Sequence, residues 1–241
     1  MVLTRTRSAN AYEAGRGSPE RVATLPQERH PRETARVEAF SDGVFAIAIT
    51  LLVLELRPPP LSEGEHLAAA LAADWPAYLA FLTSFLIILV IWINHHNLFN
   101  LIGRSDRTFL ILNGMLLLAT SFVPFPTILV ATHLLGPGAS VAMAVYAATG
   151  VGIALAFNGI WRYASRGRRL LAPSVSDAAV SSINRVYTVG PALYGIALVL
   201  AFVHPLSSFI YCMGLGVFFA VFATIGRDPA TWNGSAAVRK G

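Results

Sequence analysis

Charged side chains are scarce in this 241-residue chain: Asp, Glu, Lys and Arg make up 13% of it, and hydrophobic residues make up 55%. A typical soluble domain carries roughly 25% charged residues, so the composition excludes a protein that meets only water and indicates an integral membrane protein. The single cysteine, Cys212, excludes an intrachain disulfide. Residues 1–36 lack the apolar core of a cleaved signal peptide, and we expect a disordered basic tail there.

Six stretches are apolar and long enough, or nearly so, to cross a bilayer as helices of about 20 residues. They are residues 37–56, 76–99, 108–133, 140–163, 186–203 and 205–225. The expected fold class is therefore all-α, with a six-helix membrane domain over 37–225 between the tail at 1–36 and a second tail at 226–241. Little more than His204 separates the last two spans, which favours a tight helical hairpin.

Positive charge is distributed unevenly along the chain. Of 18 Lys and Arg residues, all but Arg57 lie in the two tails or near the links after the second and fourth spans. This bias predicts that both ends of the chain lie in the cytoplasm and that the number of crossings is even. The same basic clusters would suit an anionic lipid surface at the cytoplasmic face. Because topology already accounts for the charge, we expect no nucleic-acid partner.

The first span has two distinct sides when residues advance by 100°. One side is polar toward its cytoplasmic end and carries Glu38, Ser41, Asp42, Phe45 and Ile49. The opposite side is apolar except for one hydroxyl and carries Gly43, Ile47, Thr50, Leu51 and Leu54. Taken alone, an apolar stripe of this kind favours contact with lipid or neighbouring helices over a pore lining.

A buried carboxylate at Asp42 requires hydrogen-bond partners. The second span ends near His95 and His96, and the third begins near Asn113, all at a depth that matches Asp42. We expect the Asp42 carboxylate to accept hydrogen bonds from Ser41, an imidazole and an amide. A shared metal ion is disfavoured because adjacent histidines on a helix point about 100° apart. A proton relay is an alternative use of the same groups.

The same residues carry a family resemblance. The element consists of Arg36-x-x-x-Phe40-Ser41-Asp42 followed by Gly43-Val44-Phe45-Ala46-Ile47, together with His95-His96, Leu112-Asn113 and Phe122-x-Pro124-Phe125. It resembles the prokaryotic branch of the transmembrane-protein-175 family of potassium channels. The resemblance covers the first three spans closely, and beyond them only the six-span count agrees.

The resemblance implies a homotetramer in a prokaryotic cell membrane, with the first helices of the four subunits surrounding a central pore. The implied function is a potassium-permeable channel whose apolar constriction acts as a gate by dewetting and as a weak selectivity filter. It implies permeant potassium ions and no cofactor or metal. By motif, the constriction and selectivity positions are Ile47, Thr50, Leu51 and Leu54. The implied helix-anchoring polar network is Arg36, Ser41, Asp42, His95, His96 and Asn113.

Two other functions would use the same polar residues. A secondary ion transporter using the buried Asp/His/Asn cluster would usually show internal repeats and interrupted helices near the midplane, and no convincing repeat is present. A membrane enzyme could use Asp42, His95 and His96 for proton transfer. No nucleophile motif or phosphate-binding glycine loop accompanies them in the sequence, so we do not expect an enzyme. The potassium-filter-like run at residues 188–190 continues into Pro191 within a span, and we interpret it as chance.

Overall fold

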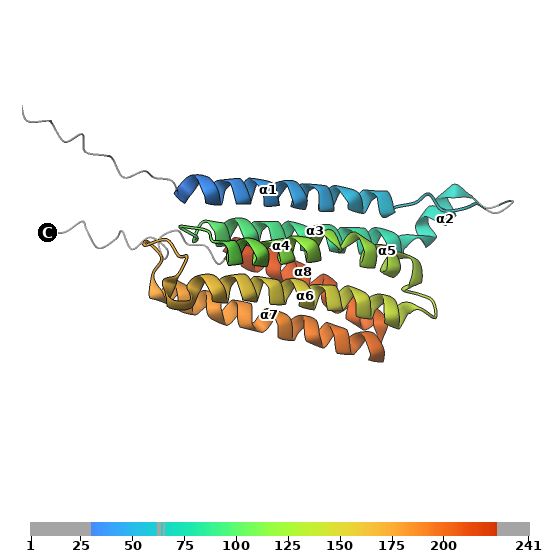
Figure 1. Cartoon of the computed structure of the whole chain (residues 1–241). Helices are drawn as coiled ribbons and strands as arrows, with labels where there is room; N and C mark the ends of the chain where they lie inside the picture. Colours follow the sequence, from blue (N-terminus) through green and yellow to red (C-terminus); the bar gives the residue numbers. More distant parts are fainter. Residues whose placement is uncertain (1–29, 62–63, 65, 226–241) are drawn as a thin grey trace, which may run out of the picture.

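The computed structural model describes residues 30–61, 64 and 66–225, and this part of the chain consists of helices joined by short links (Figure 1). The longer helices are α1 (His30–Leu51), α3 (Trp75–Phe99), α4 (Arg107–Ser121), α5 (Pro124–His133), α6 (Ala139–Ser165), α7 (Asp177–Val203) and α8 (Pro205–Ile225). Short elements are the 3-10 turns η1 (Leu52–Glu55) and η2 (Arg166–Arg168) and the helix α2 (Leu67–Ala73). The all-α prediction is confirmed.

Five predicted spans correspond to helices, or pairs of helices, that are long and apolar enough to cross a membrane. The sixth corresponds to α8, which is apolar but shorter over its described side chains, so a sixth crossing stays a prediction. α1 begins at His30, so residues 30–36, which the sequence assigned to the tail, belong to the helix. Residues 1–29 and 226–241, the remainder of the two predicted tails, lie outside the described residues.

Two prolines divide the third predicted span into α4 and α5. Pro124 and Pro126 have no backbone N–H, so the carbonyls of Thr120 and Phe122 cannot accept the usual helical bonds from them. The N–H of Val123 instead donates to Thr120 at 3.1 Å, and the N–H of Phe125 donates to Phe122 at 3.1 Å. These tighter bonds satisfy both carbonyls at the kink, as they must inside a membrane.

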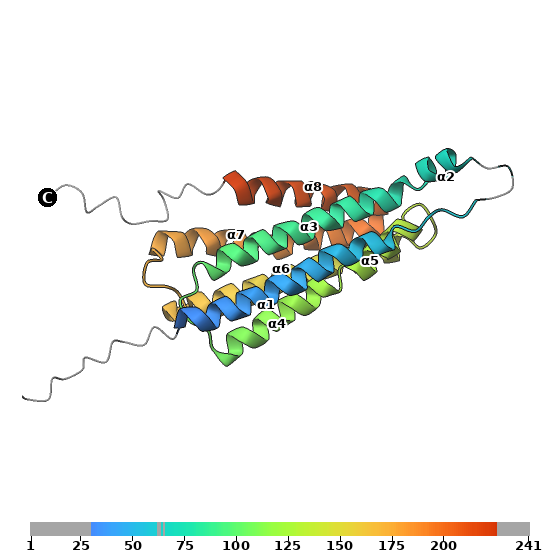
Figure 2. The same ribbon diagram turned by 90° about the horizontal axis from the view of Figure 1, so that it is seen from above.

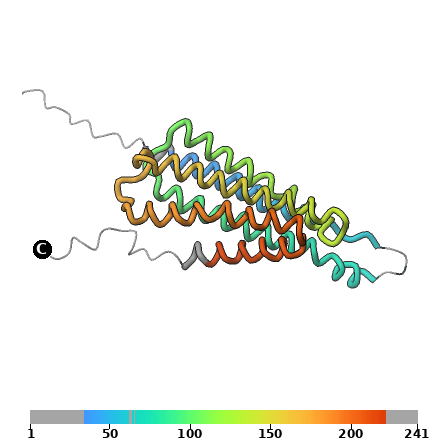
Figure 3. The backbone as a smooth tube through the Cα atoms, turned by 90° about the horizontal axis from the view of Figure 1, so that it is seen from below, coloured from blue at the N-terminus to red at the C-terminus, as the bar shows by residue number. Residues whose placement is uncertain are grey.

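Successive spans run in alternating directions, which brings both arginine-rich links to one end of the bundle, here called the basic end (Figure 2). At this end the link between α3 and α4 pairs with the link between α6 and α7. The N–H of Gly103 donates to the carbonyl of Leu170, and the N–H of Ala172 donates to that of Leu101, each at 2.9 Å. At the opposite end, His204 alone connects α7 to α8, which confirms the predicted hairpin (Figure 3).

The interior is built around α3 and α6. The ring of Tyr194 on α7 lies so close to Gly150 on α6 that a Cβ at that glycine would stand 2.4 Å from it. This close approach requires a glycine at position 150. Residues 188–190, whose sequence resembles a potassium filter, lie inside the continuous helix α7. A filter loop cannot be helical, so this placement agrees with a chance likeness.

A buried polar cluster, which the sequence did not predict, joins three helices near the kink. Ser84 on α3 lies 2.7 Å from the hydroxyl of Thr127 on α5 and 2.9 Å from that of Tyr146 on α6. The Thr127 hydroxyl also donates to the carbonyl of Val123 at 2.8 Å. The bundle that supports α1 is therefore fixed by hydrogen bonds as well as by apolar packing.

Candidate functional site

α1 lies along one side of the bundle and contacts α3 and α4 (Figure 1). The side chains that face these helices recur every three or four residues, as one side of a helix requires. They are Ser41, Phe45, Ala48 and Leu52, all buried. This spacing fixes which side of α1 is turned to the bundle, and hence which side is left uncovered.

A buried hydrogen-bond chain ties α1 to both neighbours. The amide nitrogen of Asn113 on α4 donates to the Ser41 hydroxyl oxygen at 3.0 Å, and the Ser41 hydroxyl donates to the carbonyl of Val37 at 2.8 Å. The amide oxygen of Asn113 lies 2.9 Å from Nε2 of His95 on α3. Since an amide oxygen only accepts, Nε2 carries the hydrogen and His95 donates to it. Each donor in this buried series of hydrogen bonds therefore has one acceptor.

The imidazole of His95 is enclosed by two aromatic rings. The Phe99 ring stacks on it with a centroid separation of 4.3 Å, and the Phe45 ring meets it edge-on at 5.0 Å. Its Nδ1 is buried and has no hydrogen-bond partner among the described residues. With Nε2 protonated, Nδ1 bears the lone pair of a neutral imidazole, so His95 serves as a structural donor in this arrangement.

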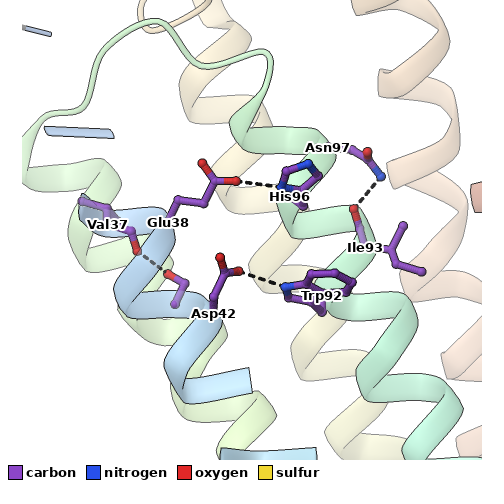
Figure 4. A network of polar contacts seen from close by, with 8 residues as sticks. Val37, Glu38, Asp42, Trp92, Ile93, His96 and Asn97 are labelled. Atoms are coloured by element: carbon purple, nitrogen blue, oxygen red, sulfur yellow. Dashed lines mark hydrogen bonds and ion pairs between the residues drawn. The ribbon is translucent and has the colours of Figure 1, made fainter. Parts of the chain in front are cut away.

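A second set of contacts joins α1 to α3 at the accessible surface of their seam (Figure 4). The Glu38 carboxylate lies 2.8 Å from Nδ1 of His96, and the indole N–H of Trp92 donates to the Asp42 carboxylate at 2.9 Å. The partners that we expected for Asp42 were therefore wrong, because its carboxylate meets an indole and lies outside the buried chain. Adjacent His95 and His96 do point to different partners, as the geometry of a helix requires.

Arg36 is exposed, and no polar contact joins it to another described residue of this chain. The structure thus brings five of the six predicted anchoring residues into two groups and leaves Arg36 outside both. The described residues include no cluster of three or more His, Cys, Asp or Glu side chains that could hold a metal ion.

Trp92 and Glu38 are anchoring residues to which sequence reasoning gave no role. Their signal was present as two matched pairs, because Glu38 and Asp42 are four residues apart on α1, and Trp92 and His96 are four apart on α3. Side chains at this spacing share one face of a helix, so two such pairs on antiparallel helices can meet at both positions.

The opposite side of α1 is uncovered in the single chain. Ile47 is 61% exposed and Leu54 is 68% exposed, and Thr50 and Leu51 are exposed beside them. The Thr50 hydroxyl lies 2.9 Å from the carbonyls of both Ala46 and Ile47, to which it donates. Because its hydrogen is engaged with the helix, the lone pairs of the exposed Thr50 oxygen are left available as an acceptor.

The anchored segment coincides with a match to known proteins. The family model described as the endosomal/lysosomal potassium channel TMEM175 matches residues 36–124, which include most of α1 and all of α3 and α4. A potassium channel of Chamaesiphon minutus is 48% identical over 191 residues, covering 78% of this chain and 94% of that protein. This chain belongs to the TMEM175 family. A potassium channel of Streptomyces collinus is 42% identical over 172 residues, covering 71% of this chain and 84% of that protein.

A solved structure supports the same assignment over most of the TMEM175 fold. The lysosomal potassium-selective channel TMEM175 homolog from Chamaesiphon minutus superposes with a TM-score of 0.74 at 46% identity, covering 80% of this chain and 99% of that one. TMEM175 proteins are channels and not enzymes, so the rival enzymatic function falls away. The chain is a multi-pass membrane protein, and its bacterial relatives indicate the plasma membrane.

Proposed function

We propose that this TMEM175 protein is a potassium-permeable channel in which four copies of α1 surround a central pore. The observation that carries the proposal is the uncovered stripe of Ile47, Thr50, Leu51 and Leu54 on a helix whose other side is hydrogen-bonded to the bundle. The hydrogen bonds set the rotation of α1, so in a symmetric assembly the same stripe would face the axis from every subunit.

The constriction would gate by dewetting. Four copies of Ile47 or Leu54 around an axis form an apolar ring in which an entering ion loses its hydration shell without replacement. The Thr50 oxygens, with their hydrogens donated inward, would present only lone pairs to the pore. Such a ring replaces part of the hydration of potassium, so we expect weak selectivity of potassium over sodium.

In this proposal the two groups of anchoring contacts hold α1 in the rotation that keeps its stripe on the axis. The basic end, where α1 begins and α8 ends, would face the cytoplasm, so the chain would make six crossings with both termini inside. Arginines of the two paired links would then lie at the depth of anionic lipid headgroups. The transporter alternative loses support because Asp42 does not join the buried Ser41–Asn113–His95 chain.

The decisive experiment compares two exposed apolar positions on opposite edges of the subunit. Leu54→Ala in η1, the turn that continues α1, should widen the constriction and raise single-channel conductance several-fold or alter the potassium/sodium permeability ratio. Val199→Ala on α7, where Val199 is 64% exposed, removes a similar apolar side chain and should leave currents unchanged. Planar-bilayer recordings of the purified protein measure both. Wild-type currents from Leu54→Ala would contradict the pore assignment.

Assembly provides a separate test. The mass of the complex in lipid nanodiscs should correspond to four chains of 25.8 kDa. A monomer or dimer that nonetheless conducts would rule out the arrangement of α1 helices proposed here.

A further inference from the structure

A cavity of about 120 Å³ lies between α3, α6, α7 and α8, on the side of the bundle away from α1. It is partly open rather than sealed. Each of α3 and α6 contributes one helical face to the wall, and the glycines Gly150, Gly190 and Gly216 line it on three different helices. The remaining lining is largely aliphatic and aromatic. The cavity is separate from the candidate pore and from the groups that anchor α1.

Two polar groups line this apolar space without partners. Asn94 on α3 and Tyr194 on α7 both belong to the lining, and neither side chain has a hydrogen-bond partner among the described residues. Both residues are partly buried, and an amide that faces an apolar cavity without a partner is costly, because the apolar walls cannot replace its hydrogen bonds. Asn94 is not needed to hold α1, since the three anchors on α3 are Trp92, His95 and His96.

The dimensions and chemistry define the class of ligand. If a methylene group takes about the 30 Å³ that a water molecule occupies in liquid water, the cavity of about 120 Å³ holds about four carbons, and its open side leaves room for about one or two more. No charged side chain lines it, so a charged headgroup would find no counterion. We propose that this cavity binds a small, uncharged amphiphile: an alkyl or aryl group of about four to six carbons carrying one hydroxyl or carbonyl, which hydrogen-bonds to Asn94.

The cavity and the proposed pore helix α1 both contact α3, but they contact different sides of it. The cavity residues Ile87, Val90, Ile91 and Asn94 recur every three or four positions along one face of α3. Trp92 and His96 lie on the other side of the helix at 100° per residue. Binding can therefore be measured without reference to conduction, and failure of either proposal leaves the other standing.

A photoreactive alcohol is the appropriate probe. The full-length protein in phosphatidylcholine nanodiscs is irradiated with a hexanol that carries a diazirine, and labelled peptides are mapped by mass spectrometry. Labelling should concentrate on the cavity walls of α3, α6 and α7 and should be displaced by excess unlabelled hexanol. Labelling spread evenly over the lipid-exposed helices, without displacement, would overturn the proposal.

Two glycines on α8 provide a matched pair of variants. A Cβ at Gly216 would lie 3.5 Å from Ile87 at the cavity wall, whereas a Cβ at the exposed Gly214 would meet nothing within 4 Å. Gly216→Leu should fill the cavity and reduce wall labelling at least fivefold, and Gly214→Leu should leave it unchanged. Equal labelling of the two variants would contradict a site in this cavity.

The role of the amide is tested by a variant of nearly equal size that leaves the glycines in place. Asn94→Leu should reduce labelling by the photoreactive hexanol about fivefold, and labelling by a diazirine-bearing hexane, which has no hydroxyl, should not fall. A fall that is the same for both probes would exclude the hydrogen bond. Strong wall labelling by a phospholipid with a diazirine at its chain end, undisplaced by hexanol, would identify a lipid chain as the occupant and overturn the proposed class.

Discussion

The two outermost helices of the subunit, α1 and α7, are held in different ways. Both leave most of their apolar residues uncovered. Within the most apolar stretch of each span, 22% is buried for α1 and 11% for α7. α7 is tied near both ends, by Trp161 to Asn184 at 2.7 Å and by Ser208 to the carbonyl of Ala197 at 2.7 Å. Among the described residues, no side-chain hydrogen bond joins α1 to another element beyond Asp42.

This difference shows what hydrogen bonds contribute in a membrane. Apolar contacts between helices compete with equally apolar lipid, so they set the rotation of a helix weakly, whereas a hydrogen bond between two defined atoms sets it strongly. α7 is fixed along its length, but α1 is fixed at the basic end and only packed at the other, where Leu52 is buried. A helix held at one end can tilt about that end, and the gate proposed at Leu54 would use such a tilt.

The largest expected effect comes from removing the centre of the α1 anchor. Asn113→Ala leaves the buried Nε2–H of His95 and the Ser41 oxygen unpaired, and should cost about 2–3 kcal/mol. Asn184→Ala leaves only one group unpaired, the indole N–H of the buried Trp161, and should cost about 1–2 kcal/mol. Thermal midpoints of the purified variants in one detergent measure the two effects. Equal losses would show that α1 and α7 are anchored alike.

A second comparison tests packing at the two edges. Gly150→Ala forces a methyl group into the Tyr194 ring between α6 and α7 and should destabilise the protein by about 1–3 kcal/mol. Gly43→Ala on the uncovered side of α1 meets nothing within 4 Å in the subunit and should gain up to about 1 kcal/mol from helix propensity. Denaturant titrations in mixed micelles measure both changes. A stabilised Gly150→Ala would mean that α7 is not closely packed there.

A smaller effect is expected at the accessible seam between α1 and α3. Trp92→Phe keeps an aromatic ring but removes the donor to Asp42, and should cost about 1 kcal/mol. Asp42→Asn keeps an oxygen that can accept from the indole, so its thermal midpoint should stay close to that of the wild type. If Asp42→Asn proves the more harmful change, the charge of Asp42 matters for a contact outside the single subunit.

The smallest expected effect concerns Asp106, which precedes α4 at the basic end. The backbone N–H of Phe109, together with the hydroxyl of Tyr163, holds the pKa of the Asp106 carboxyl below its usual range. A carboxyl whose pKa is lower in the folded state stabilises the protein fully above the unfolded pKa of about 3.9, and this contribution is lost as pH falls through the folded pKa. The stability advantage of wild type over Asp106→Asn should therefore shrink as pH falls below about 4 in a series of thermal melts. If the advantage of wild type grew as pH fell, folding would raise the pKa of Asp106 instead of lowering it.

Long apolar runs were sufficient to predict the main helices, and the short break at His204 was sufficient to predict the hairpin. They did not reveal the short helix α2, because an alanine-rich run of seven residues gives no span-length signal. At the candidate site, sequence grouped Ser41, His95 and Asn113 correctly but gave Asp42 the wrong partners. Pairing across helices depends on their rotation and relative height, which a hydropathy pattern does not specify.

The paired links at the basic end constrain the order in which the chain can complete its fold. The N–H of Gly103 and the carbonyl of Leu101 find their partners in residues that follow α6 in the sequence. A nascent chain that has inserted α1, α3 and α4 therefore cannot close this end until Leu170 and Ala172 have left the ribosome. The segment that matches the family model, residues 36–124, thus depends on the later helices to seal its own boundary during biogenesis.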